Sequence, residues 1–471
     1  MIYINKTAST SYYLQIYRHI LDNILSGKYP AGYVLPGSRI LAADVGVGRN
    51  TVDNAYAQLA TEGYIKATAG LGFRVLSLPE LLLEKGKKRA VPELPAGNSS
   101  QVPVLYDLFY GSLSNQDFPL AAWKKCTLEV LAEENSSRIN IYPGNKGDYE
   151  LRSQLSSYLF ETRGVNCTPE QILITPGLQG SLEVLCKLLY PEGGSHGFEE
   201  PGYDKALFIF QRHGIKTVLM DSDDAGAIPE SLHTDRKIRS IYLTPSHQFP
   251  MGTIMSIGRR YEFLNWAIKN DAYIIEDDYD SDYSYYTNPI PAFQSIDTSG
   301  RVIYLGNFSK TLSPSMRMGY LILPAELAER YEREMAKYNC MVPWLMQRIL
   351  ARFIAQGHYR RLVRKLRTKY KSTHDLLLKE IRRMSPDIQV ISEGSGLKFL
   401  LEFPRDMHRD WLMDTAREHG VKVYSPERFW QRKELCPPNL IMIGFTAIEP
   451  EEILPCMEIL KKVWFPASEC L

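Results

Sequence analysis

The chain has 471 residues, of which 44% are hydrophobic and 23% are charged, and its 55 Lys and Arg side chains almost balance its 54 Asp and Glu side chains. This composition predicts a soluble protein of about two to four domains and excludes both a disordered chain and a polycation that coats nucleic acid along its whole length. No apolar run approaches the roughly 18 residues of a membrane helix, and the N-terminus lacks the pattern of a secretory signal. We therefore expect a cytoplasmic protein without a membrane partner.

A composition break divides the chain in two. Residues 77–104 combine charged residues with Pro, Gly and Ser and show no apolar periodicity, which is typical of an interdomain linker. The sequence thus predicts a first domain over residues 1–76, a linker over 77–104 and a second domain over 105–471. The first domain carries seven basic against four acidic side chains, a modest excess that suits a reader of nucleic acid.

The first domain begins with helical patterns. Apolar side chains recur at three- and four-residue spacing over residues 13–25, which predicts an amphipathic helix. A short helix is expected over 38–42 with Ser38 as its N-cap. A tight turn at 45–48 then leads into a further helix over about 49–61.

Two short strands follow these helices, at 64–67 and 73–75, around a Gly-containing tip at 70–72. Helix, helix, tight turn, helix and hairpin is the order of a winged helix-turn-helix, whose recognition helix enters the major groove of DNA. Arg and Asn side chains suit guanine and adenine edges or phosphates. The expected DNA-binding residues are Arg39, Arg49, Asn50, Thr51 and Gly70.

The second domain contains short apolar stretches that each end in a polar loop marked by Gly, Pro or acidic residues. They lie at 171–174, 240–243, 272–275 and 302–305. This pattern predicts a mostly parallel sheet between helices. Ligands of such sheets bind beyond the carboxyl ends of the strands, where these loops would gather.

Several of the loop residues suit a phosphate. Gly177, Leu178 and Gln179 open a predicted helix, whose N-terminus offers backbone N–H groups and a positive dipole end. Ser309 adds a hydroxyl and Arg317 a guanidinium for the same anion.

Other loop residues suit an aromatic aldehyde that carries the phosphate. Lys310 is an amine able to form a Schiff base. Asp277 would pair with a pyridinium nitrogen, and Tyr279 would hydrogen-bond a phenolic oxygen. Together these groups predict a site for pyridoxal 5'-phosphate (PLP). The nine His residues show no metal-ligand spacing, so no metal site is expected.

The first domain resembles the GntR-type winged helix-turn-helix in the run from Leu35 to Ala42 (LPGSRILA) and in Val47-Gly48-Arg49-Asn50-Thr51-Val52, where Gly48 stands in place of a capping Ser. The second domain resembles the fold-type I PLP-dependent aminotransferases over almost all of residues 105–471. The whole chain thus looks like the MocR family of bacterial transcription regulators. This resemblance implies an α/β second domain with a mostly parallel sheet sandwiched by helices and a smaller C-terminal subdomain.

The resemblance also implies roles for single residues. Lys310 matches the Schiff-base lysine, and the ring and phosphate contacts fall on the residues named above. Tyr142 matches a tyrosine that reaches the phosphate of the neighbouring subunit, which implies a homodimer, and Tyr203 would lie near the ring or ligand.

Two departures from the aminotransferase pattern concern ligand binding. The usual Asn-Pro-x-Gly loop is replaced by Phe249-Pro-Met-Gly, so Gln248 or His247 would substitute for the Asn, or the contact is absent. The Arg that clamps a ligand carboxylate is replaced, and Ala447 stands at its expected position. Lys205 and Arg428 are candidate replacements.

These features lead to three hypotheses. The first is a dimeric PLP-dependent transcription regulator that binds operator DNA and senses a small amine, an amino acid or PLP itself. The second is an active aminotransferase with a fused DNA-binding head, against which the missing Arg counts. The third is a DNA-binding protein whose second domain is only a dimerisation scaffold.

Overall fold

The computed structural model describes residues 2–7, 9–68, 70, 72–78, 103–133, 139, 141–232, 237–286, 290–391 and 393–466. The chain divides into two compact units, Met1–Ser100 and Gln101–Leu471. Most of the predicted linker lies outside the described residues. A search of the described residues finds no helix with the length and apolar character needed to span a membrane.

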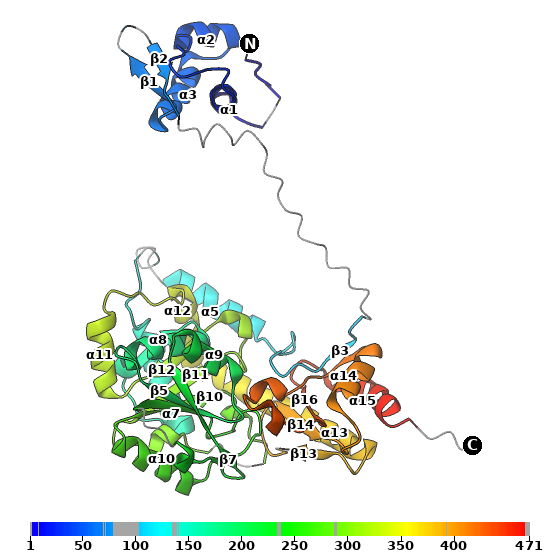
Figure 1. The fold of residues 1–471 in the computed structure, drawn as a ribbon. Coiled ribbons are helices and arrows are strands. Elements are labelled where there is room, and N and C mark those ends of the chain that lie inside the picture. The colour runs from blue at the N-terminus through cyan, green and yellow to red at the C-terminus, as the bar shows by residue number, and fades with distance from the viewer. Residues whose placement is uncertain are drawn as a thin grey trace. The chain divides into compact units, whose positions relative to one another are not determined.

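The described part of the first unit holds three helices and a two-stranded antiparallel sheet (Figure 1). Ile16, Ile20 and Ile24 form the buried face of the first helix, at the spacing that the sequence predicts. The elements are α1 (Tyr12–Leu25), α2 (Ser38–Val45), α3 (Arg49–Thr61), β1 (Ile65–Thr68) and β2 (Gly72–Val75).

One local prediction in this unit is wrong. Ser38 is the first residue of α2 and does not cap it, because Gly37 takes the N-cap position with φ −57° and ψ 143°. Gly48 holds the corresponding position before α3, and neither helix has a side-chain cap. Backbone N–H groups at the start of α3 are therefore left without an intramolecular side-chain acceptor.

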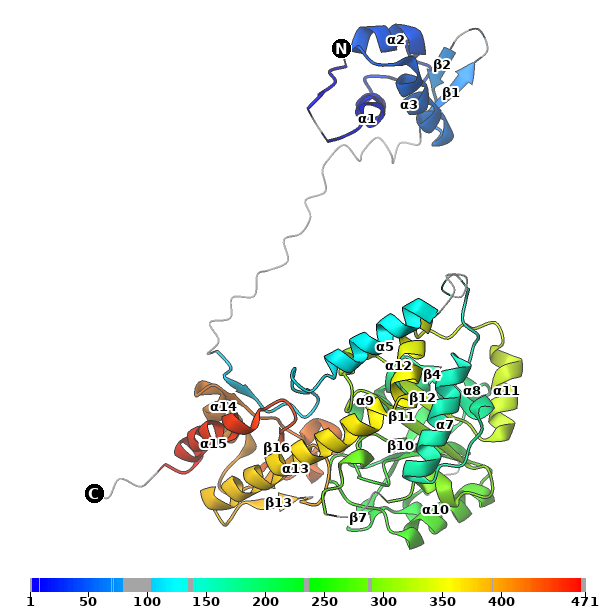
Figure 2. The ribbon, with the colours of Figure 1, turned by 180° about the vertical axis from the view of Figure 1, so that it is seen from behind.

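The described residues of the second unit form a seven-stranded sheet in the order β4-β12-β11-β10-β9-β5-β6 (Figures 1 and 2). Every neighbouring pair is parallel except those that involve β12. The strands are β4 (Ile172–Thr175), β5 (Ser195–Glu199), β6 (Lys216–Met220), β9 (Ile238–Leu243), β10 (Tyr273–Asp278), β11 (Val302–Asn307) and β12 (Gly319–Ile322). The four strands predicted from the sequence are β4, β9, β10 and β11.

Helices cover both faces of this sheet because its strands are apolar on both sides. Ile172 and Ile174 of β4 belong to a core cluster with α5, α7, α12 and α13, whereas Leu173 belongs to a second cluster with α8, α9 and α11. The helices are α5 (Leu120–Glu133), α7 (Tyr149–Arg163), α8 (Gly177–Leu189), α9 (Asp204–Arg212), α10 (Ile257–Lys269), α11 (Ala325–Met335), α12 (Trp344–Ala355) and α13 (His358–Met384). A mostly parallel sheet between helices is therefore confirmed.

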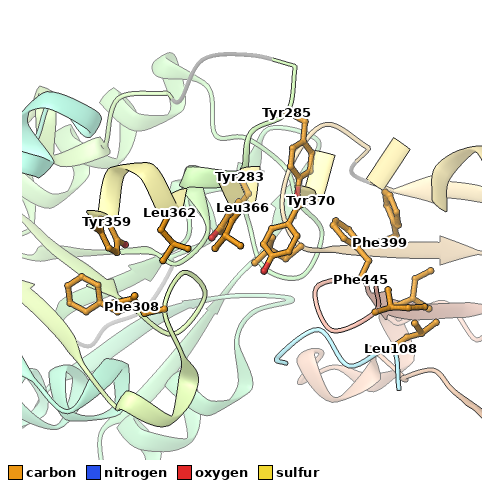
Figure 3. Close-up of a cluster of buried hydrophobic side chains, with 14 of the residues drawn as sticks. Leu108, Tyr283, Tyr285, Phe308, Tyr359, Leu362, Leu366, Tyr370, Phe399 and Phe445 are labelled. Carbon is orange, nitrogen blue, oxygen red and sulfur yellow. The ribbon is translucent and has the colours of Figure 1, made fainter. Parts of the chain in front are cut away.

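A smaller C-terminal subdomain packs around an antiparallel sheet in the order β13-β14-β16. The long helix α13 joins it to the larger part: Phe308 packs against Tyr359 at the start of α13, and Phe399 and Phe445 pack against His374 further along the helix (Figure 3). One core cluster thus continues through both parts of the unit. The remaining elements are β3 (Tyr106–Asp107), β7 (Ser222–Asp223), β8 (Gly226–Ala227), β13 (Gln389–Ile391), β14 (Lys398–Glu402), α14 (Arg409–Glu418), β15 (Val421–Lys422), β16 (Leu440–Gly444) and α15 (Pro450–Trp464).

Candidate functional site

A cavity of about 800 Å³ lies where the loops after β4, β9, β10 and β11 meet. Its wall also includes residues 109–111 and 397–398, which come from the N-terminal stretch of the unit and from the small subdomain. The cavity therefore sits at the carboxyl ends of the parallel strands, as the sequence predicts.

One end of the cavity has the character of an anion site. Leu178, Gln179, Ser309 and Arg317 line it, and α8 begins at Gly177. Gly177 has φ +77°, and a Cβ added there would lie 3.2 Å from Nη2 of Arg317. The guanidinium thus packs against the first residue of a helix whose N-terminus is positive, an arrangement that suits a phosphate.

Asp277 brings a buried carboxylate to the cavity from the end of β10. It is 4% exposed, its Oδ2 accepts a hydrogen bond from the hydroxyl of Tyr242, and its Oδ1 has no hydrogen-bond partner among the described residues. Burial raises the pKa of Asp277 to about 7, while the Tyr242 hydroxyl opposes that rise. An unsatisfied carboxylate oxygen of this kind requires a donor or cation from a ligand.

The next residue of β10 anchors the strand end that carries Asp277. Oδ2 of Asp278 accepts from Nε of Arg163 at 2.8 Å and from the hydroxyl of Tyr304 at 2.5 Å. The side chains of Arg163 and Asp278 are 3% and 2% exposed, respectively. This buried ion pair fixes the strand on the side opposite the cavity.

Tyr279 lies in a polar network. Its hydroxyl is 3.1 Å from Nδ1 of His247 and 3.2 Å from Nζ of Lys398, and His247 in turn lies 2.9 Å from Oδ2 of Asp280. Gln248 is committed to the backbone, because its amide donates to the carbonyls of Pro201 and Phe249. Of the two residues predicted to substitute for the missing Asn, His247 is the one that reaches the Tyr279 hydroxyl.

Lys310 extends from the loop after β11 into the same cavity. Its Nζ donates to the backbone carbonyl of Tyr110 at 2.8 Å and lies 5.4 Å from the centroid of that ring. Desolvation lowers the pKa of Lys310 to about 8; Asp280 opposes the effect, and Lys398 and Lys205 add to it. A lysine with this pKa has an appreciable neutral fraction at physiological pH, as an amine nucleophile requires.

The remaining residues predicted for this site fall in different places. Tyr203 lines the cavity and packs edge-on against Phe249 at 5.3 Å between ring centroids. Tyr142 is 85% exposed and is not part of the cavity wall. Its predicted contact with a neighbouring subunit stays a prediction.

Several positively charged side chains in or near the cavity could replace the Arg that binds a ligand carboxylate in aminotransferases. Lys205 lines the cavity and is exposed, whereas Arg428 is held outside the wall by the Tyr110 hydroxyl at 2.6 Å and by Asp204 at 3.6 Å. Ala447 does not line the cavity either. Lys398, which the sequence reasoning did not single out, lines it and is 5% exposed.

A signal for Lys398 was present in the sequence, because it interrupts the apolar run Leu397-Lys398-Phe399-Leu400-Leu401. A charged residue in such a run is seldom buried unless it has a partner. Tyr110 gave no comparable signal, because its contact with Lys310 uses the backbone carbonyl.

In the first unit, the residues predicted to bind DNA lie on the exposed side of the helix-turn-helix. Arg49 and Asn50 are exposed at the start of α3, and Thr51 is half-buried beside them. Arg39 is exposed on α2, and Gly70 is exposed in the turn between β1 and β2 with φ +76°. Arg49 pairs with Asp53 at 3.3 Å, and both side chains remain largely solvated.

Comparison with known proteins agrees with this geometry. Residues 12–75 match the gntR family of bacterial regulatory proteins, and residues 110–436 match the class I and II aminotransferases. The chain is 33% identical to the uncharacterized HTH-type transcriptional regulator YdeL of Bacillus subtilis (strain 168), over 98% of both chains. It is 31% identical to the probable rhizopine catabolism regulatory protein MocR of Rhizobium meliloti, over 96% of this chain and 93% of that one. The solved structure of an archaeal alanine:glyoxylate aminotransferase is similar with a TM-score of 0.69 and 25% identity, over 77% of this chain and 91% of that one.

The fold and the cavity thus define a transcription regulator in which a GntR-type helix-turn-helix is joined to a fold-type I aminotransferase domain, a class whose enzymes depend on PLP. The chain belongs to the MocR family of bacterial regulators. The residues present fit PLP, because an unsatisfied carboxylate oxygen, a lysine with a lowered pKa and a helix N-terminus backed by a guanidinium line one cavity.

Proposed function

We propose that the protein is a dimeric regulator that binds operator DNA through its first unit and responds, through PLP held in its second unit, to a small amine, an amino acid or PLP itself. The observation that carries this proposal is the unsatisfied Oδ1 of Asp277 in the same cavity as Lys310. A dimerisation scaffold has no need of a buried carboxylate without a donor, which costs about 1–3 kcal/mol or more.

Each part of the cavity would hold a different part of the cofactor. Gly177, Leu178, Gln179, Ser309 and Arg317 would bind the phosphate. The other contacts come from residues around the ring: Asp277 would accept from the ring nitrogen, Tyr279 would donate to the phenolic oxygen, Tyr203 would lie near the ring, and Lys310 would hold the aldehyde carbon.

PLP supplies an aldehyde that bonds reversibly to primary amines. The protein's residues prepare that exchange. Asp277 would stabilise a protonated ring nitrogen, because a buried carboxylate favours a cationic partner. Desolvation lowers the pKa of Lys310, so in a fraction of the molecules its amine is neutral and would be able to bond to the aldehyde.

Lys310 contacts the stretch of chain that follows the linker. Its Nζ holds the carbonyl of Tyr110, and the backbone before Tyr110 pairs with the small subdomain through Leu108 N to Lys422 O at 3.0 Å and Leu105 N to Gly420 O at 2.8 Å. This stretch follows the residues that join the two units. A change in the bonding of Lys310 would alter a contact of that stretch, which is a physical basis for an effect on DNA binding.

Two features support a dimer. Gln179 and Arg317 are exposed, so the phosphate end of the cavity opens to the surface, where Tyr142 of a second subunit would close it. Large apolar side chains are also exposed on α5 and α7, such as Leu128 at 58% and Phe160 at 64%.

The test is the visible absorption spectrum of the purified full chain, titrated with PLP, amines and amino acids. A band that forms with PLP, shifts with one compound and then persists supports the sensor. A shifted band that relaxes while a keto acid accumulates would show an active aminotransferase. Absence of any band with PLP would refute the cofactor site, and Lys310→Ala is expected to lose the covalent attachment that borohydride reduction traps in the wild type.

A further inference from the structure

Lys398 is a buried cation at the junction of the small subdomain and the cavity. It begins β14, and the strand's two-residue period places it on the same face as Leu400, which belongs to an aromatic cluster with Tyr110 and Phe249. Phe399 and Leu401 face the main core instead. The fold therefore directs the Lys398 side chain to the cavity wall.

The surroundings of Lys398 leave its charge poorly compensated. Its Nζ is 3.2 Å from the Tyr279 hydroxyl and lies 4.7 Å and 5.5 Å from the ring centroids of Phe249 and Tyr279. Among the described residues no carboxylate lies within ion-pair distance of this Nζ. The charge of Asp280 raises the pKa of Lys398, but Asp280 is itself paired with His247. An ammonium has three donors, and this one uses a single hydrogen bond within the described chain.

The cost of this arrangement indicates a ligand. A buried ammonium without an anionic partner is unfavourable, and cation–π contacts offset that cost only in part. Desolvation lowers the pKa of Lys398 only to about 8, so the side chain is still mainly charged at pH 7. An apolar residue would pack better against Phe249 if no anion entered the cavity.

The position of Lys398 separates this anion from the cofactor phosphate. The phosphate end is formed by α8 and Arg317, whereas Lys398 lies on the side of the Tyr279 hydroxyl. Lys310 and Lys398 are close enough that the charge of Lys398 lowers the pKa of Lys310. A small molecule whose amine replaces Lys310 on the cofactor can therefore place an anionic group near Lys398.

We propose that Lys398 binds the carboxylate of an amino-acid effector and so takes the place of the absent arginine clamp. The inference rests on the proposed function and narrows it from amines in general to amines that carry a carboxylate. Lys205 and Arg212 also line the cavity, but both side chains are exposed, so water already solvates their charges.

The experiment compares L-alanine and β-alanine with ethylamine, which is either amino acid without its carboxylate. Dissociation constants are measured from the shift of the visible band of the PLP-loaded full chain. The proteins are the wild type, Lys398→Met, Lys398→Arg and Lys205→Met. Methionine fills a similar volume and keeps the contacts with the rings, so it removes the charge with little change in packing.

We expect at least one alanine isomer to bind the wild type more tightly than ethylamine. Lys398→Met should weaken that binding about 10- to 100-fold, the range of a charged hydrogen bond, and should change the binding of ethylamine much less, because ethylamine senses only the shifted pKa of Lys310. Lys398→Arg should retain the preference for the carboxylate, as should Lys205→Met.

Three results would overturn the inference. The first is that the wild type binds ethylamine and both alanines with equal affinity. The second is that Lys398→Met weakens the binding of all three ligands equally. The third is that the preference for a carboxylate is lost in Lys205→Met and kept in Lys398→Met. Failure of the proposed function looks different, because a chain that forms no band with PLP fails before any of these ligands is added.

Discussion

The lowered pKa of Lys310 makes a quantitative prediction about how PLP attaches to the protein. Attachment needs the neutral amine, and burial lowers the pKa from 10.5 to about 8. At pH 7 about one Lys310 in ten is then neutral, against about one in 3,000 for an ordinary lysine, a gain of about 300-fold. The sign follows from desolvation, which disfavours the charged form of a lysine.

The assay mixes the cofactor-free full chain with PLP and follows the growth of the visible band between pH 6 and pH 10. The same reaction with Nα-acetyl-lysine, expressed as a rate per neutral amine at each pH, corrects for the ionisations of PLP itself. The corrected rate should rise about tenfold from pH 6 to pH 7 and level off above about pH 8. Lys310→Ala is the control for attachment at other lysines.

A corrected rate that keeps rising tenfold per pH unit between pH 8 and pH 10 would refute this reasoning, because it would place Lys310 at an ordinary pKa. The neighbouring charges provide a second check. Lys398→Met removes a positive charge that lowers the pKa of Lys310, so the midpoint should move to higher pH, and Lys205→Met should move it the same way by less.

Three further predictions concern single side chains. Arg163→Met should destabilise the fold by about 3–5 kcal/mol in urea unfolding, because its buried aspartate partner is left uncompensated; a loss below about 1 kcal/mol would contradict the buried pair. Gly177→Ala should weaken PLP retention in equilibrium dialysis, because its Cβ would press on Arg317, whereas Gly214→Ala has a similar positive φ with open space around it and should bind PLP normally. Arg49→Ala should weaken binding to DNA selected by the full chain about tenfold or more, with the unfolding midpoint and the PLP band unchanged, since its ion pair is largely solvated; unaltered DNA affinity would exclude it from the interface.

Much of the fold could be predicted because its signals are local. The spacing of Ile16, Ile20 and Ile24 predicts α1, and the apolar runs before the polar loops predict the parallel strands. The order of the strands is not local, and β12 is antiparallel in a sheet where the sequence indicates only a mostly parallel one. Ser38 was misplaced by one residue because both Gly37 and Ser38 can occupy an N-cap.

Site residues could be predicted from the sequence where a chemically distinctive residue follows or ends a predicted strand. Asp277 and Lys310 are of this kind, and the structure places both in one cavity. The contacts that come from distant parts of the chain could not be predicted. Tyr110 acts through a backbone carbonyl, and Lys398 comes from the small sheet, 88 residues beyond Lys310 in the chain.

The origins of these residues indicate how a ligand can connect the parts of the second unit. Lys310 follows a strand of the large sheet, Lys398 begins a strand of the small one, and the stretch ending at Tyr110 is hydrogen-bonded to the small subdomain. On the proposed binding mode, a plain amine that takes the place of Lys310 on the cofactor would contact mainly the large sheet, whereas an amine whose carboxylate reaches Lys398 would contact both sheets at once. Only contacts that differ between two arrangements can shift their populations. The carboxylate is therefore the part of an effector best placed to convert occupation of the cavity into a change in how the DNA-binding unit is held.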